Sequence, residues 1–196
     1  ESLLVHGGTS GVGAFAIALA RALGHPVLAT AGGEAKCAAV RAWGATAIDY
    51  RREDFAERVL AETGGRGVDV VLDMVGGGYL ARNLSCLAMD GRVVQIAFLE
   101  GARAELDLMQ LMRKRAVLTG SLLRPRGDAD KAAIVRALAE HVFPLIEQGR
   151  LRPPVIDSVH TMAAAREAHA RMAASAHIGK LVLAWDPSLA RAPAGA

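Results

Sequence analysis

The feature that most constrains this chain is the regular alternation of short apolar runs with segments of helical periodicity. The apolar runs are candidate strands, at Leu3 to His6, Val27 to Thr30, Ala47 to Tyr50, Val68 to Met74, Arg92 to Ile96 and Ala116 to Gly120. They are nearly continuous in apolar residues, which is typical of strands covered by helices on both faces. The pattern therefore predicts an α/β fold with a doubly wound, six-stranded parallel sheet.

Helical periodicity fills the intervals between these strands. In the first interval Val12, Phe15, Leu19 and Leu23 recur at helical spacing and stop at Gly24, a residue type that commonly ends helices. Further helices are predicted at Glu34 to Trp43, Arg52 to Glu62, Tyr79 to Leu87, Leu106 to Met112 and Ala129 to Gln148, the last with a kink at Pro144.

The pattern changes after Gly149. A Pro-containing stretch leads to a strand at Val155 to Val159, a helix at Ala163 to Ala174 and a last strand at Ile178 to Trp185. We therefore predict a first domain at 1–150, a C-terminal segment at 151–185 that is too small to be a domain, and a disordered Pro- and Ala-rich tail at 186–196.

Composition narrows the class of ligand and the compartment. The chain is 52% hydrophobic, and its net charge of +3 comes from scattered arginines, which favours a small anionic ligand over nucleic acid. Two cysteines cannot form a disulfide framework, and no apolar run approaches the roughly 20 residues of a membrane helix. Without a signal peptide, a cytoplasmic protein is expected. Because a strand begins almost directly after Glu1, we also expect that the chain was excised from a longer protein.

A glycine-rich segment lies between the first predicted strand and the first predicted helix. It reads Gly8-Thr9-Ser10-Gly11-Val12-Gly13. Glycines there permit a tight turn, close approach of the backbone to a pyrophosphate, and close packing of the helix on its strand. The N–H groups and partial positive charge of the helix N-terminus favour an anion at the same place. The segment therefore predicts a dinucleotide-binding loop.

The loop resembles those of two families. Read as Gly7-x-x-x-Gly11-x-Gly13 it resembles the short-chain dehydrogenases, whose chemistry needs a Tyr-x-x-x-Lys pair; here Tyr50 is followed by Asp54 and Tyr79 by Asn83, so the pair is missing. Read from Gly8 it resembles the medium-chain dehydrogenase/reductase superfamily, particularly its zinc-free quinone oxidoreductase branch. Further segments resemble that branch in the same order: Thr30-Ala31-Gly32, Lys36, Trp43-Gly44-Ala45, Tyr50 to Phe55, Gly67 to Asp73, Gly91-Arg92 and Ile178 to Leu183. Cys86 to Gly91 and Ser121 to Arg124 suggest the subgroup of tumour-suppressor-inducible quinone oxidoreductases.

The resemblance covers residues 2 to 185 and implies a Rossmann domain whose C-terminal segment is the remnant of a GroES-like catalytic domain. The N-terminal part of that catalytic domain has no counterpart here, and Gly44 to Tyr50 is one residue shorter than usual. In the family, hydride passes from NADPH to a quinone or related electrophilic carbonyl, and subunits pair through the sixth strand, so a homodimer is expected. The resemblance identifies no catalytic acid or base in this chain.

The end of the second strand bears on which dinucleotide is bound. It reads Thr30-Ala31-Gly32-Gly33, without the acid that usually meets the ribose of NAD, although Glu34 follows closely. By resemblance Lys36 meets the 2′-phosphate of NADPH and Tyr50 lies beside the adenosine. From the residues alone, Lys36 could equally be an exposed helix lysine, Tyr50 a half-buried strand end, and Arg51 and Arg52 a solvated helix start.

Other candidate residues follow the later strands, at the carboxyl edge where open α/β sheets bind ligands. By resemblance Val75, Ala97, Phe98, Leu99, Ser121 and Leu122 lie beside the cofactor, although loop packing would also account for them. Asp73, inside a buried-looking run, is read as a cap for a neighbouring loop. The six histidines lack His-Glu-x-x-His spacing and no Cys-x-x-Cys occurs, so no zinc site is expected.

Two alternatives to a quinone reductase stay open. An enoyl reductase domain of a polyketide or fatty-acid synthase has a similar nucleotide loop, and the domains that flank such a domain in the full-length gene would distinguish it. A non-catalytic NADPH-binding module is the other alternative, and it would bind the cofactor without turnover.

Overall fold

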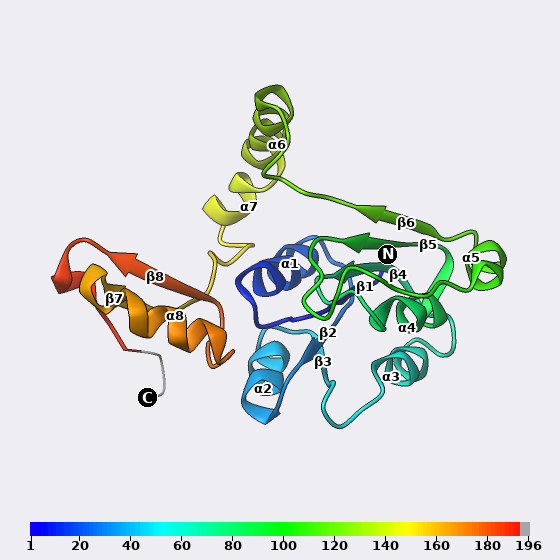
Figure 1. Cartoon of the computed structure of the whole chain (residues 1–196). Coiled ribbons are helices and arrows are strands. Elements are labelled where there is room, and N and C mark those ends of the chain that lie inside the picture. The colour runs from blue at the N-terminus through cyan, green and yellow to red at the C-terminus, as the bar shows by residue number, and fades with distance from the viewer. Residues whose placement is uncertain (193–196) are drawn as a thin grey trace.

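The protein forms a six-stranded parallel sheet with helices on both faces, followed by a separate two-stranded unit (Figure 1). The structure is a computed structural model that describes residues 1–192. The large sheet has the order β3-β2-β1-β4-β5-β6, and every neighbouring pair is parallel. Its strands are β1 (Leu3–Val5), β2 (Val27–Ala31), β3 (Thr46–Asp49), β4 (Val68–Asp73), β5 (Leu87–Gln95) and β6 (Val117–Gly120). The predicted doubly wound α/β fold is confirmed.

Two apolar cores hold the helices against the sheet. On one face α1 (Gly11–Ala22) and α2 (Glu34–Ala42) pack against inward residues of β1 and β2, with Ile17 and Val40 fully buried. On the other face α3 (Phe55–Glu62) and α4 (Tyr79–Ser85) enclose Phe55 and its neighbours. Because β1 lies between β2 and β4, its end is where the chain order reverses, the place at which such sheets bind ligands.

The fifth strand differs from the sequence prediction. We expected a helix to reach Leu87 and a strand to begin at Arg92, but β5 begins at Leu87. Leu87 pairs with Val68 and is 1% exposed, so burial against β4 outweighs the helical periodicity of its neighbours. The pairing shifts register before Arg92, where Asp90 adopts a left-handed conformation with φ of 60°. The strand therefore contains a bend that the sequence pattern did not reveal.

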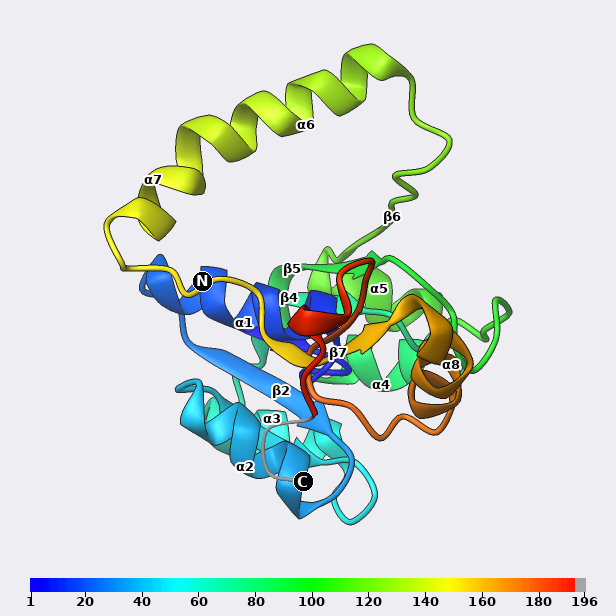
Figure 2. The same ribbon diagram turned by 90° about the vertical axis from the view of Figure 1, so that its left-hand side faces the viewer.

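β6 pairs with β5 at the edge of the sheet, and the long helix after it stands away from the rest of the protein (Figure 2). α5 (Leu108–Lys114) precedes β6, and α6 (Asp128–His141) follows it; none of the residues of β6 or α6 is buried. The predicted single helix with a kink at Pro144 is instead two helices, because Pro144 falls in the first turn of α7 (Phe143–Glu147), where proline is tolerated. Leu145 of α7 packs against α1.

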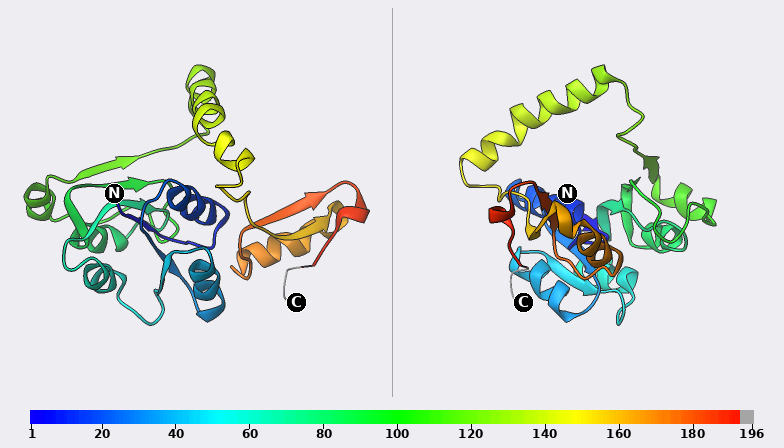
Figure 3. Two further views of the ribbon diagram at one scale, coloured as in Figure 1. Left: turned by 180° about the vertical axis from the view of Figure 1, so that it is seen from behind. Right: turned by 60° about the vertical axis from the view of Figure 1, so that its left-hand side comes forward.

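The C-terminal unit lies beside the ends of α1 and α2, apart from the large sheet (Figure 3). It consists of β7 (Ile156–Thr161), a 3-10 turn at Met162–Ala164, α8 (Ala165–Ala173) and β8 (Lys180–Ala184), with β7 and β8 parallel. The tail that we expected to be disordered contains a 3-10 turn at Pro187–Leu189, and Arg191 pairs with Val159. The remainder of that tail, 193–196, lies outside the described residues. None of the helices within 1–192 combines the length and apolarity of a membrane span.

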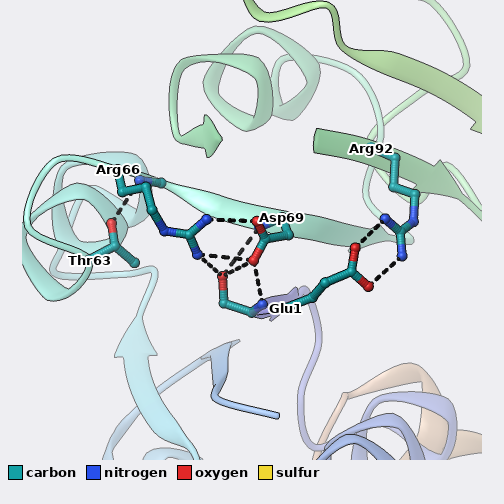
Figure 4. A network of polar contacts seen from close by, with 7 residues as sticks. Glu1, Thr63, Arg66, Asp69 and Arg92 are labelled. Carbon is teal, nitrogen blue, oxygen red and sulfur yellow. Dashed lines mark hydrogen bonds and ion pairs between the residues drawn. The ribbon is translucent and has the colours of Figure 1, made fainter. Parts of the chain in front are cut away.

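A polar network fixes the start of β1 against β4 (Figure 4). The backbone N–H of Ser2 donates to Asp69 at 2.6 Å, and Arg66 pairs with the same carboxylate at 2.7 Å. These contacts hold the pKa of Asp69 well below its usual range, first through the hydrogen bond from Arg66. Glu1 pairs with Arg92 of β5 beside this network. The amino edge of the central strands is thus closed by ion pairs, on the side opposite the glycine-rich loop.

Candidate functional site

The glycine-rich loop closes tightly on its neighbours. Gly7 has φ of +64°, a conformation that other residues rarely adopt, and a side chain at Gly13 would overlap the carbonyl oxygen of Gly7. A side chain at Gly8 would lie 2.8 Å from the Cβ of Ala29 on β2. Ser10 caps α1, because its hydroxyl accepts the N–H of Gly13 at 2.9 Å. The remaining first-turn N–H groups of α1 have no intrahelical acceptor and favour an anion at the loop.

A cleft of about 370 Å³ opens at the carboxyl edge of the sheet beside this loop. It is bounded by the loop, by the ends of β2 and β4, and by the segment that leads into β8. Eight of the predicted cofactor residues line it, namely Thr9, Ser10, Thr30, Gly32, Lys36, Tyr50, Val75 and Leu99. The structure thus brings together residues from five separate parts of the sequence.

The other predicted site residues do not line the cleft. Gly8, Gly11, Val12, Gly13 and Gly33 belong to the surrounding turns and to the start of α1. Phe98 lines a neighbouring hollow of about 300 Å³ between the loops after β4 and β5 and the strand β6, and Ala97 lines neither space. Ser121 directly follows β6, and its N–H donates to the Gln95 carbonyl of β5 at 3.0 Å. Leu122 is 62% exposed and faces α6, because the chain turns away from the sheet after Ser121. The structure therefore does not place these two residues beside the cofactor cleft.

Basic groups gather at one end of the cleft, around Gly32 and Gly33. The Lys36 ammonium donates to the Ser175 carbonyl at 2.6 Å, and its pKa is lowered by burial and then by the nearby Arg51. The Arg51 guanidinium lies beside Gly32 and Gly33, where an added Cβ would be 3.0 and 3.7 Å from its nitrogens. His177 lines the same end, and its pKa is lowered by burial and then by Lys36. The positive charges of Lys36 and Arg51 at this end suit a phosphate group.

Nearby acids do not occupy that end of the cleft. Glu34, which follows the glycines of β2, pairs with Arg41. Asp49 accepts the N–H of Gly33 at 3.1 Å, and that hydrogen bond is the first cause of its lowered pKa. Both carboxylates are therefore bound to other groups of the protein.

Sequence reasoning missed three contributors to the site. For Arg51 the sequence leaves a solvated helix start open, and the residue is exposed, yet its guanidinium lies beside Gly32 and Gly33. His177 and Lys180 come from the C-terminal unit, and the side chain of Lys180 covers Gly11, its ammonium 2.8 Å from where a Cβ would stand. The Gly179 N–H also donates to Thr9 at 2.8 Å. The resemblance at Ile178 to Leu183 includes Lys180 but not His177, and it does not predict that either residue lies near the loop.

Comparison with known proteins agrees with this geometry. Residues 43–183 match the model of a family described as zinc-binding dehydrogenase. A quinone oxidoreductase of Pseudomonas aeruginosa is 35% identical over 93% of this chain and 56% of its own length. A mycocerosic acid synthase-like polyketide synthase of Mycobacterium tuberculosis is 36% identical over 93% of this chain and 9% of its own length. The crystal structure of an Escherichia coli quinone oxidoreductase complexed with NADPH has a TM-score of 0.80 at 30% identity, covering 93% of this chain and 56% of that one.

The chain belongs to the zinc-binding dehydrogenase family and corresponds to the cofactor-binding half of the medium-chain dehydrogenase/reductases. It spans about half the length of the quinone oxidoreductases it matches and a small part of the polyketide synthase. Within residues 1–192, His, Cys, Asp and Glu form no group of three or more that could hold a metal ion.

Proposed function

We propose that this chain binds NADPH in an oxidoreductase that transfers hydride to a quinone or related electrophilic carbonyl. The observation that carries the cofactor assignment is the basic end of the cleft, which Lys36 and His177 line, with the Arg51 guanidinium beside Gly32 and Gly33. A 2′-phosphate there would replace the Ser175 carbonyl as the partner of Lys36. An acid at the end of β2, which would repel that phosphate, is absent from the sequence.

The glycine-rich loop and Lys180 would hold the pyrophosphate. The bare backbone of Gly11 leaves room for the Lys180 side chain, which packs on it and so places the ammonium at the start of α1, beside the loop. Val75 and Leu99, at the other end of the cleft, would pack beside the reactive ring and limit the access of water. When bound, NADPH supplies the hydride, and the protein supplies orientation.

Calorimetric titration with NADPH and NADH tests the cofactor assignment. We expect NADPH to bind the chain at least about tenfold more tightly, because a charge-assisted phosphate contact contributes roughly 1.5 to 3 kcal/mol. Lys36→Ala and Arg51→Ala should each reduce this preference. Arg136→Ala, which removes the same charge from the exposed α6, is the matched control and should leave it unchanged. Equal affinity of the unmodified chain for both cofactors would exclude the assignment.

A second candidate is an enoyl reductase domain of a polyketide synthase. The similarity to the Mycobacterium tuberculosis polyketide synthase, which extends over 93% of this chain, favours it. Both candidates use the same cofactor cleft, so the acceptor distinguishes them. NADPH oxidation should be measured with a soluble quinone and with an enoyl thioester, using the Pseudomonas aeruginosa quinone oxidoreductase as the reference enzyme. A clear preference for the thioester would favour the polyketide candidate.

We further propose that the acceptor site has a second wall outside these 196 residues. Hydride transfer depends on holding donor and acceptor in near-attack geometry, a contribution that can reach roughly 7 to 11 kcal/mol. The chain alone should therefore bind NADPH but oxidise it with a quinone far more slowly than the reference enzyme. Comparable turnover at equal cofactor occupancy would show that the acceptor site lies within this chain.

A homodimer through β6 is the proposed assembly. β6 lies at the edge of the sheet, and Val117 and Leu118 are 52% and 42% exposed. Unpaired apolar strand edges favour pairing with another chain. Light scattering should give the mass of a dimer, and Leu118→Lys should shift it towards the monomer, whereas Leu189→Lys on the exposed tail should not. A monomer at all concentrations would contradict the proposal.

A further inference from the structure

A continuous chain of polar side chains runs through the core directly beneath the cleft. His6 follows β1, and its Nδ1 and Nε2 lie 3.1 Å from Thr30 Oγ1 and 2.7 Å from Asn83 Oδ1. The amide nitrogen of Asn83, on α4, donates to Asp73 Oδ2 at 2.9 Å. All four side chains are buried, with no more than 1% of any residue exposed. Buried polar groups of this kind are retained at a cost unless each is fully hydrogen-bonded.

The hydrogen-bond partners of these side chains determine which atom donates and which accepts in each hydrogen bond of the network. Because Asn83 donates its amide nitrogen to Asp73, its oxygen faces His6 and must accept from Nε2–H. Nδ1 of the neutral ring is then an acceptor, and the Thr30 hydroxyl donates to it. Burial lowers the pKa of His6, which keeps the ring in this neutral form. Each lone pair and proton of the imidazole therefore has a partner.

The two ends of this network of polar side chains reach opposite walls of the cleft. At one end Thr30 Oγ1 accepts the N–H of Gly7, in the tight turn that opens the glycine-rich loop, at 3.3 Å. At the other end Asp73 Oδ1 accepts the N–H groups of Val75 and Gly76 at 2.6 and 3.2 Å. The prediction that Asp73 caps a neighbouring loop is thus confirmed. Both turns have left-handed glycines, with φ of 64° at Gly7 and 71° at Gly76.

Two half-sites lie on either side of this network of polar side chains. The basic end of the cleft follows β2 and β3, whereas Val75 and Leu99 follow β4 and β5. β1 separates β2 from β4 in the sheet, so His6 lies under the middle of the cleft. A dinucleotide must contact both half-sites at once, but a mononucleotide needs only one.

We propose that His6 is a positioning residue for the dinucleotide. Through Thr30 on one side and the Asn83–Asp73 pair on the other, it holds the two half-sites at the separation that the whole cofactor requires. The inference rests on the proposed NADPH-binding function. A purely structural role, as a ring packed 4.7 Å from Phe55 and 4.9 Å from Tyr79, makes a different prediction, because it affects both half-sites together.

Titration of variants with NADPH and with adenosine 2′,5′-bisphosphate tests the proposal. The bisphosphate contacts only the basic half-site. His6→Leu replaces the imidazole with an apolar side chain of similar bulk and removes both hydrogen bonds. NADPH should then bind about tenfold more weakly, while the affinity for the bisphosphate should change less than about twofold. His6→Gln, which can keep one of the bonds, should recover part of the NADPH affinity. Val59→Ala is the control: it leaves a cavity in the same core but removes no hydrogen bond. It should change neither affinity in the folded protein.

A second measurement does not depend on ligand. In His6→Leu and in the milder Thr30→Val, amide hydrogen exchange should accelerate at Gly7, and in His6→Leu also at Val75 and Gly76. Equal weakening of both ligands by His6→Leu, or unchanged NADPH affinity, would overturn the positioning role. If the unmodified protein binds neither ligand, the proposed function fails, whereas the exchange measurement still reports whether His6 couples the two turns.

Discussion

The centre of the large sheet and the arm formed by β6 and α6 (residues 117–141) are built from similar residues but differ in burial. In the centre Leu4, Ile17 and Phe55 are completely buried between helices and strands. In the arm Leu118, Ile134 and Val135 are 42%, 37% and 59% exposed. The arm keeps its helix through local effects, such as Asp128 and Asp130 in the first turn. Apolar residues at helical spacing therefore establish a helix but do not establish that anything covers it.

This contrast predicts very different costs for shortening apolar side chains. Phe55→Ala should lower the free energy of unfolding by about 3 to 5 kcal/mol, because it leaves a cavity beside His6 and Tyr79 and removes the ring under Arg82. Val135→Ala in the arm should change it by less than about 0.5 kcal/mol. Urea unfolding followed by circular dichroism measures both values. Similar losses would show that α6 packs against the protein in solution.

Glycines give a second comparison. Gly13→Ala should destabilise the protein by about 1 to 3 kcal/mol, because the methyl group would overlap the Gly7 carbonyl and force α1 away from β1. Nucleotide binding should weaken with it. Gly127→Ala, at the N-cap of α6 with no atom near the added methyl group, should change stability by less than about 1 kcal/mol, because the weaker cap is offset by the smaller entropy of the unfolded chain. Thermal unfolding and cofactor titration should be measured for both variants. Similar losses in the two would show that tight backbone packing around glycine is not confined to the glycine-rich loop.

The ion pairs at the amino edge of the sheet should make stability depend on pH. The folded-state pKa of Asp69 is lowered, so its contribution is present above the usual pKa of 3.8 and is lost as pH falls through and below that value. Arg66 is 56% exposed, so solvent screening limits the effect to about 1 kcal/mol. Asp69→Asn should therefore lose less stability between pH 6 and pH 3 than the unmodified protein. The exposed pair of Asp90 and Arg115 is the control, and Asp90→Asn should leave the pH profile almost unchanged.

The smallest effect is expected from charge in the arm. Val135→Lys should alter the free energy of unfolding by less than about 0.5 kcal/mol, because the residue already faces solvent. The solubility of the variant protein should rise, because the lysine interrupts the apolar surface formed by Leu122, Ile134 and Leu138. A loss above about 2 kcal/mol in chemical denaturation would mean that this surface is buried, in the same chain or in a second copy.

The sequence by itself determined the alternation of strands and helices, the parallel sheet, the glycine-rich loop and the absence of an acid after β2. These follow from local rules: apolar period, helix stops and the glycines required by a tight turn. The eight predicted residues that line the cleft lie at the ends of strands or follow them, and topology gathers these positions at one edge. Only the tertiary structure decided that β5 begins at Leu87 and that the chain turns away from the sheet after Ser121. It also decided that His177 lines the cleft, that Arg51 lies beside Gly32 and that Lys180 packs on Gly11. Those outcomes depend on contacts between residues distant in sequence, as when Lys180 covers Gly11, and no local pattern encodes such a contact.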